Sequence, residues 1–176
     1  MASKWPKQDR NSMNAFYGNP DRNQDGAADS AWESKNLTTI VPPYNLWYSD
    51  DRTGKLIKRS IQFRKLRVHN RCSVSLLNIL TKIGEKFSAA DIEKYELDIC
   101  GGAFNFRLMR SGRSLSIHSW GAAIDLSHLI NRYKRKYDGS KNMMPEEVVK
   151  IFSDEGWTWG GIWKTGDAMH FQAADL

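Results

Sequence analysis

The chain is poor in the residues that build cross-linked or membrane-spanning proteins. Only two of its 176 residues are cysteines, Cys72 and Cys100, and neither belongs to a CxxC pair. This argues against a thiolate zinc site and a disulfide scaffold, and favours two buried, reduced thiols. Because no run of about 18 apolar residues is present, we expect no membrane span and no stable membrane insertion.

The N-terminal residues MASKWPKQDRNSMNAF also lack the apolar stretch of a secretory signal. We therefore expect the chain to be made in a cytoplasm and, if it acts outside, to need another agent for its release. Lys and Arg number 26 against 20 Asp and Glu, a net charge of +6. This modest excess is typical either of ordinary solubility or of an anionic partner. The basic stretches 54–67 and 131–141 lack regularly interleaved aromatics, which argues against nucleic acid.

The chain is long enough, and its apolar residues recur regularly enough, to form one domain over residues 1–176. Residues 1–50 are polar and rich in turn signals, so we expect an irregular segment that packs on the domain. Helical periodicity predicts helices over 73–87, with Ser73 as N-cap, and over 89–95 and 145–155. Strands are predicted over 60–68, 98–106, 121–126 and 168–172. The mixture predicts an α+β fold, with a small antiparallel sheet and flanking helices.

Two of the four histidines stand near an aspartate: His118 lies seven residues before Asp125, and Asp167 lies three before His170. An aspartate in an apolar run is costly to bury unless it has a partner. Strand alternation directs Asp125 and His170 away from the core face, on which we expect Phe171 and Met169. These side chains are therefore expected to meet in one cleft, where a turn at Gly166 would also bring Asp167.

Two imidazoles and one carboxylate make a three-ligand zinc set, with a fourth position left for water. His118, Asp125 and His170 would be the ligands, and Asp167 a nearby carboxylate that takes a proton during hydrolysis. The alternative interpretation is that each histidine is a packed, hydrogen-bonded core residue. His69 and His128 match neither pattern, and we interpret both as surface or capping residues.

The string S-x-H-x-x-G-x-A-x-D, running from Ser116 to Asp125, and the later D-x-x-H resemble a known family. It is the zinc D-alanyl-D-alanine carboxypeptidase and L-alanyl-D-glutamate peptidase family (VanY-like). Segments 14–20, 104–126 and 155–172 are similar to its phage and prophage endolysin branch, most specifically over 100–173, the expected metal-site core. The resemblance implies a hedgehog/D,D-peptidase-like fold and one zinc per chain, held by the three ligands named above.

The resemblance also implies two catalytic residues. Asp167 would be the general base, and Arg107 would stabilise the oxyanion as charge builds. Arg110 and Arg113 lie close by and stay open as alternatives for the arginine.

Two further residues are expected to contact the substrate. Ser116 would hydrogen-bond a polar end of the substrate or merely cap the turn. Trp163 is the expected wall of the cleft, whereas Trp157 and Trp159 are expected to pack in the core.

The function implied is that of an endolysin: a zinc metallopeptidase that cleaves the peptidoglycan stem peptide as an L-alanyl-D-glutamate endopeptidase. Such a monomer would wait in the host cytoplasm for holin-dependent release. The alternatives are a D-alanyl-D-alanine carboxypeptidase and, outside enzymes, a zinc-containing cell-wall-binding module. Asp167 and Arg107 argue against the binding module, since a structural zinc site needs neither.

Overall fold

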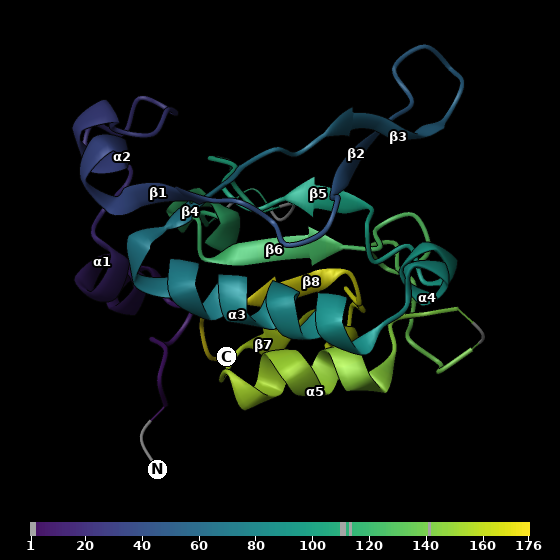
Figure 1. Ribbon diagram of the computed structural model, residues 1–176. Coiled ribbons are helices and arrows are strands. Elements are labelled where there is room, and N and C mark those ends of the chain that lie inside the picture. The colour runs from purple at the N-terminus through teal and green to yellow at the C-terminus, as the bar shows by residue number, and fades with distance from the viewer. Residues whose placement is uncertain (1–2, 110–111, 113, 141) are drawn as a thin grey trace.

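Figure 1 shows the computed structural model of the chain, which describes residues 3–109, 112, 114–140 and 142–176. Its helices are α1 (Arg10–Tyr17), α2 (Ser30–Asn36), α3 (Asn70–Lys86), α4 (Ala89–Lys94), α5 (Glu146–Asp154) and the short 3-10 helices η1 (Ile117–Trp120) and η2 (Gly160–Ile162). Its strands are β1 (Leu37–Ile40), β2 (Trp47–Asp50), β3 (Ile57–Gln62), β4 (Leu66–His69), β5 (Cys100–Gly102), β6 (Ala123–Leu126), β7 (Thr158–Trp159) and β8 (His170–Gln172).

These strands form three small antiparallel sheets, with the orders β1-β4, β2-β3 and β5-β6-β8-β7. The predicted α+β class, with small antiparallel sheets and helices, is confirmed at this level. Within the described part of the chain, no helix has the length and apolar character needed to cross a membrane.

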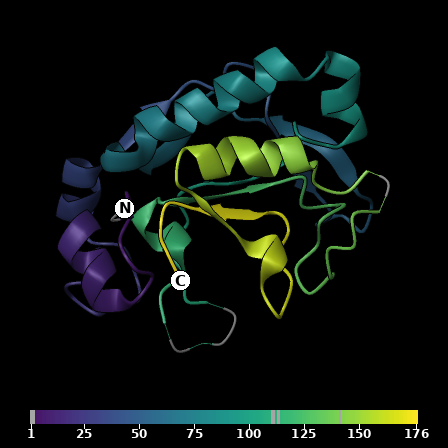
Figure 2. The same cartoon turned by 90° about the horizontal axis from the view of Figure 1, so that it is seen from below.

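The apolar core holds the four-stranded sheet in place. Helices α3 and α5 lie side by side, as Figures 1 and 2 both show. On α5 the ring of Phe152 stacks on Phe171 of β8, with the ring centroids 3.8 Å apart. Burying a side chain of this size contributes about 1.5–3 kcal/mol. Because successive residues of a strand point to opposite faces, this packing directs the neighbouring His170 away from α5.

The N-terminal segment is more regular than the sequence predicts, so the expectation of an irregular segment over 1–50 is wrong. It contains α1, α2, β1 and β2. Asp9 and Asp29 cap the two helices by accepting hydrogen bonds from main-chain N–H groups. The helices have only 8 and 7 residues, too few for helical periodicity to stand out. Met13 and Tyr17 of α1 are buried, and the Tyr17 hydroxyl donates to the Ala173 carbonyl at 2.7 Å.

The single strand predicted over 60–68 is in fact two strands. Strand β3 pairs with β2, whereas β4 pairs with β1, so this segment leaves one sheet and enters another. The sequence shows the change as a shift in alternation, because the apolar positions pass from Ile61 and Phe63 to Leu66 and Val68. The shift marks the boundary between the sheets rather than an irregularity within one strand.

Helix α3 begins at Asn70, three residues before the predicted N-cap Ser73. The capping residue is His69, whose Nδ1 accepts a hydrogen bond from the Arg71 N–H at 3.1 Å. Its Nε2–H donates to the Tyr17 carbonyl at 2.9 Å. His69 is thus a cap, one of the two roles expected for it, but it is fully buried rather than on the surface.

Candidate metal centre

The pairing of β6 with β8 brings Asp125 opposite His170. The two residues are partners in the antiparallel register, so their side chains leave the sheet on the same face. His118 comes from η1, which is followed by the C-cap residue Gly121 with a left-handed φ of +67°. A Cβ on Gly121 would lie 2.8 Å from the main-chain nitrogen of His69, so glycine is required for this reversal. The seven-residue spacing of His118 and Asp125 is therefore one 3-10 turn, a glycine reversal and the start of a strand.

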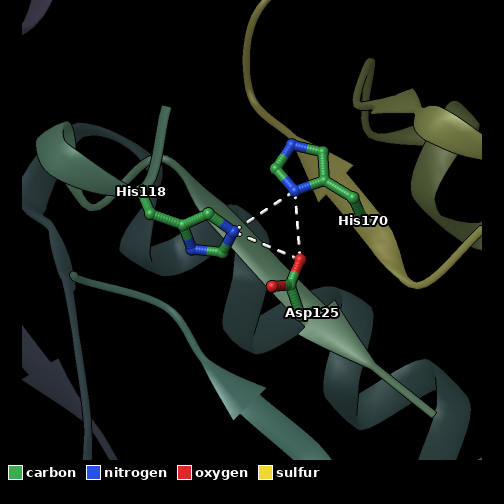
Figure 3. Close-up of side chains that lie close together, drawn as sticks. All are labelled: His118, Asp125 and His170. Carbon is green, nitrogen blue, oxygen red and sulfur yellow. Dashed lines mark hydrogen bonds and ion pairs between the residues drawn. The ribbon is translucent and has the colours of Figure 1, made fainter. Parts of the chain in front are cut away.

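The three side chains converge on one point, as Figure 3 shows. His118 Nε2 lies 3.2 Å from Asp125 Oδ1 and 3.2 Å from His170 Nδ1, and His170 Nδ1 lies 3.0 Å from Asp125 Oδ1. Ligand atoms at about 2.0–2.1 Å from a tetrahedral zinc ion are about 3.3 Å apart. The spacing of the three donor atoms therefore fits one metal ion.

The hydrogen bonds around the cluster fix which ring nitrogens carry protons. His118 Nδ1–H donates to the Ala103 carbonyl at 2.7 Å, and His170 Nε2–H donates to Gln172 Oε1 at 3.1 Å. The Gln172 amide is oriented in turn, because its nitrogen donates to Gln8 Oε1 and to a main-chain carbonyl. While both rings are neutral, His118 Nε2 and His170 Nδ1 therefore turn lone pairs toward each other and toward a carboxylate, an arrangement that a proton or a metal cation stabilises.

The charges within the cluster favour an ionised carboxylate. Burial by itself would raise the pKa of Asp125, but the imidazoles of His118 and His170 hold it well below its usual range. For His170, burial lowers the pKa, yet the hydrogen bond and charge of Asp125, together with the charge of Asp167, leave it raised. Gly101 makes room for the carboxylate, because a Cβ there would lie 3.1 Å from that of Asp125.

A cavity of about 300 Å³ opens beside the cluster. Four residues singled out in the sequence line it together with Asp125 and His170: Arg107, Ser116, Trp163 and Asp167. His118 is not among the lining residues and is only 2% exposed. The structure therefore brings the predicted ligands, base, arginine and contact residues together at one place.

Asp167 reaches this cavity through a turn. Gly166 has a left-handed φ of +66°, and the main-chain N–H of His170 then donates to the main-chain carbonyl of Asp167 at 3.0 Å. This is the turn that the sequence predicts at Gly166. The expectation for Met169 is wrong, because this residue lines the cavity instead of joining the core. Strand β8 starts only at His170, so strand alternation does not extend back to Met169.

Arg107 is fixed relative to the helix that carries His118. The main-chain N–H of Arg107 donates to Ser119 Oγ at 3.0 Å, and the Ser119 hydroxyl donates back to the main-chain carbonyl of Arg107 at 2.8 Å. The other two arginines, Arg110 and Arg113, lie outside the described residues.

Ser116 precedes η1 at the N-cap position, and its hydroxyl makes no capping hydrogen bond there. The Ser116 side chain therefore does not cap the turn. Ser116 is 5% exposed and lines the cavity.

The tryptophans divide as their positions predict. Trp157 is buried, and the ring of Trp159 stacks on Phe171 while its Nε1–H donates to the Ala168 carbonyl at 2.9 Å. The ring of Trp163 lies 5.4 Å from that of His170, on the wall of the cavity.

Several residues of the site have little or no signal in the sequence. Tyr133 and Thr165 line the cavity, as do Gln8 near the N-terminus and Leu176 at the opposite end of the chain. Gln172 was detectable, because it follows His170 by two positions and shares its face of the strand. Gln8 was not, because 164 positions separate it from Gln172.

The two cysteines take no part in the cluster. Cys72 and Cys100 are buried and not joined in a disulfide, and burial raises the pKa of each thiol to about 12. Among the described residues, His118, Asp125 and His170 form the one group of three or more metal-binding side chains.

Comparison with known proteins supports the interpretation of this site as that of a peptidase, over part of the chain. Residues 110–173, 64 of the 176, match the model of a family described as D-alanyl-D-alanine carboxypeptidase. The matched range contains the three clustered residues and Asp167, and Arg107 lies three residues before it. No curated protein and no solved structure matches the chain. Over these 64 residues the chain is similar to a peptidase family, which supports a metallopeptidase that acts on peptidoglycan-related peptides.

Proposed function

We propose that the chain is a zinc-dependent endolysin that cleaves the peptidoglycan stem peptide between L-alanine and D-glutamate. The observation that carries the proposal is the convergence of His118 Nε2, His170 Nδ1 and Asp125 Oδ1 on one point, at the wall of a cavity that Asp167 also lines. The family match supports the peptidase class. The resemblance to the phage and prophage branch supports the bond and the endolysin role.

In this proposal His118, Asp125 and His170 hold one zinc ion. When bound, the ion supplies positive charge that polarises the scissile carbonyl and makes water more acidic. The Asp167 carboxylate accepts the proton of the attacking water and later delivers it to the leaving amine.

The remaining cavity residues act on the peptide itself. Arg107 donates N–H groups to the carbonyl oxygen as negative charge develops there, and its main chain is fixed to the helix of His118. Ser116 and Trp163 hold the peptide against the cavity wall.

A D-alanyl-D-alanine carboxypeptidase is the second candidate, because the matching family carries that description. A carboxypeptidase encloses a free terminal carboxylate, whereas an endopeptidase must admit chain on both sides of the bond. Tyr133 comes from the basic segment 131–141 and lines the cavity, which suits a groove edge that faces an anionic polymer. A wall-binding module without activity would need neither Asp167 nor Arg107 at the site.

The setting of the proposed enzyme follows from the same resemblance. We propose a single catalytic domain over residues 1–176, with a hedgehog/D,D-peptidase-like fold and its metal-site core in residues 100–173. The protein would act as a monomer on the stem peptide of the bacterial wall. It would wait in the host cytoplasm and reach the wall after a holin opens the membrane.

Digestion of purified peptidoglycan, with the released fragments identified by mass spectrometry, tests the proposal. The zinc-loaded protein should produce new alanine C-termini and new glutamate N-termini. His118→Ala should produce none, whereas His128→Ala, which alters a histidine outside the cluster, should match the wild type. Free D-alanine as the only product would replace the endopeptidase with the carboxypeptidase. An undigested wall would contradict both.

A further inference from the structure

A second cavity, of about 410 Å³, adjoins the one at the metal centre. The two cavities share four lining residues: Gln8, Met109, Ile117 and Leu176. They are therefore separated by no more than one layer of side chains. A peptide whose scissile bond lies at the metal centre would meet the second cavity as it continues past this layer.

The wall between the two cavities is anchored to the metal centre. The Gln8 N–H donates to the Asp175 carbonyl at 2.7 Å, and the Asp175 N–H donates to the Pro6 carbonyl at 2.8 Å. The Gln8 side chain accepts a hydrogen bond from Gln172, which holds His170. The Gln8 part of this wall is thus held by main-chain and side-chain bonds, as a binding surface of fixed shape requires.

The chemistry of the second cavity differs from that of the first. Its apolar lining includes the buried Leu115 and Trp120 together with the exposed Met109 and Leu176 that it shares with the first cavity. Of its charged residues, Asp9 caps α1 and Arg10 forms an ion pair with Asp21 at 3.1 Å. Lys7, also in the lining, is exposed and, among the described residues, has no ion-pair partner. An aliphatic stem that ends in a carboxylate complements such a surface.

We propose that the second cavity is a substrate subsite that binds the part of an acidic peptide lying beyond the cleaved bond. The inference rests on the proposed function, because the occupant is the continuation of the substrate at the metal centre. It adds a second recognition element to that function: apolar contact together with a carboxylate held by Lys7.

Calorimetric binding of synthetic peptides to the zinc-loaded Asp167→Asn protein tests the subsite without turnover. The short probe is an L-alanyl-D-glutamyl dipeptide blocked at both ends. The long probes extend it at either end by two residues, one of which carries a side-chain carboxylate. At least one long probe should bind about fivefold or more tighter than the short one, as expected for one ion pair and some apolar contact.

Two variants then locate the binding. Ser114→Trp fills the second cavity and Lys7→Glu reverses its charge, and neither residue lines the first cavity. Each should remove the advantage of the long probe and leave the affinity for the short probe unchanged. Ser153→Trp on α5 and Lys55→Glu on the β2–β3 connection are matched controls at exposed positions, and they should behave as the parent protein does.

Equal affinity for long and short probes would overturn the subsite, and so would a long-probe advantage that survives both variants. A loss of affinity for both probes in Ser114→Trp and Lys7→Glu would also overturn it, because these residues would then act on the whole fold or on the first cavity. Failure of the wild-type protein to digest peptidoglycan is a separate result, which contradicts the proposed function and not the binding of the long probe.

Discussion

The environment of His69 and that of the His118–His170 pair are both buried, but they differ in the partners of the ring nitrogens. At the junction of β4 and α3, both ring nitrogens of His69 are bound to the main chain, one to the Arg71 N–H and one to the Tyr17 carbonyl. At the metal centre, His118 and His170 each use one nitrogen to hold the ring and turn the other toward Asp125. Burial of a histidine is therefore no sign of a metal ligand. The sign is an unprotonated ring nitrogen that no main-chain N–H occupies and that faces a carboxylate and a second imidazole.

The electrostatics of the two environments differ in the same way. Burial lowers the pKa of His69 to about 4, so this ring stays neutral at neutral pH. Burial acts to lower the pKa of His170 as well, but the Asp125 carboxylate stabilises positive charge beside the ring and leaves this pKa raised. The first environment disfavours a cation and the second attracts one.

The largest expected effect separates the two environments directly. His170→Ala removes a proposed ligand and should reduce peptidoglycan hydrolysis to the level of a protein-free blank. His69→Asn, at a temperature where the protein stays folded, should keep near wild-type activity. The measurement is release of soluble peptide from purified peptidoglycan. Equal loss of activity in the two variants, with both proteins folded, would contradict the distinction.

Asp167→Asn is expected to have the next largest effect, and it separates the ligands from the proposed base. The variant should keep its zinc and lose roughly two or more decades of rate, because an amide cannot accept the proton. Metal content and rate are measured on the same preparation. If the variant loses its metal instead, Asp167 is a ligand and the role of Asp125 must be reassigned.

Arg107 is expected to have a smaller effect, on turnover more than on binding. Arg107→Ala should lower kcat by about one to two decades with little change in KM, because the guanidinium acts chiefly in the transition state. Arg107→Lys should restore little, since an ammonium lacks the planar fork. Steady-state kinetics on a defined peptide gives both constants. Near wild-type kinetics of Arg107→Ala would show that another arginine has this role.

The smallest effect on activity, with a clear effect on stability, is expected at His69. Its folded pKa of about 4 lies below the ordinary 6.5, so the unfolded chain binds a proton first as the pH falls. The titration of His69 therefore leaves the free energy of unfolding unchanged above about pH 6.5. Between pH 6.5 and about 4 it lowers that free energy, by up to about 3 kcal/mol.

His69→Asn keeps a capping side chain but leaves the Tyr17 carbonyl without its donor, at a cost of about 1–2 kcal/mol at pH 7. Its urea unfolding curves at pH 7 and pH 4.5 should then differ less than those of the wild type. The other titrating groups are common to both proteins, so the difference isolates His69. An unchanged pH dependence would show that the ring does not titrate in this range.

The sequence predicts the metal half of the molecule better than the N-terminal half, for a physical reason. His118 and Asp125 lie within one turn and one short strand, and the D-x-x-H pair within another turn, so their spacing carries the geometry. The helix over 73–87 was predicted from a long apolar stripe, although its start at Asn70 depends on a histidine cap. Helices α1 and α2 are too short for such a stripe.

Long-range contacts left no local signal. The bond between Gln172 and Gln8, which orients His170, joins opposite ends of the chain. The change of sheet between β3 and β4 depends on the partners β2 and β1, which no pattern within residues 57–69 specifies.

The central claim is that His118, Asp125 and His170 form a metal site, and elemental analysis of the purified protein tests it most directly. The wild type, Asp167→Asn and His69→Asn should each hold about one zinc per chain after zinc addition and removal of the excess. His118→Ala and His170→Ala should hold none. Wild-type protein that retains no zinc under these conditions would contradict the account.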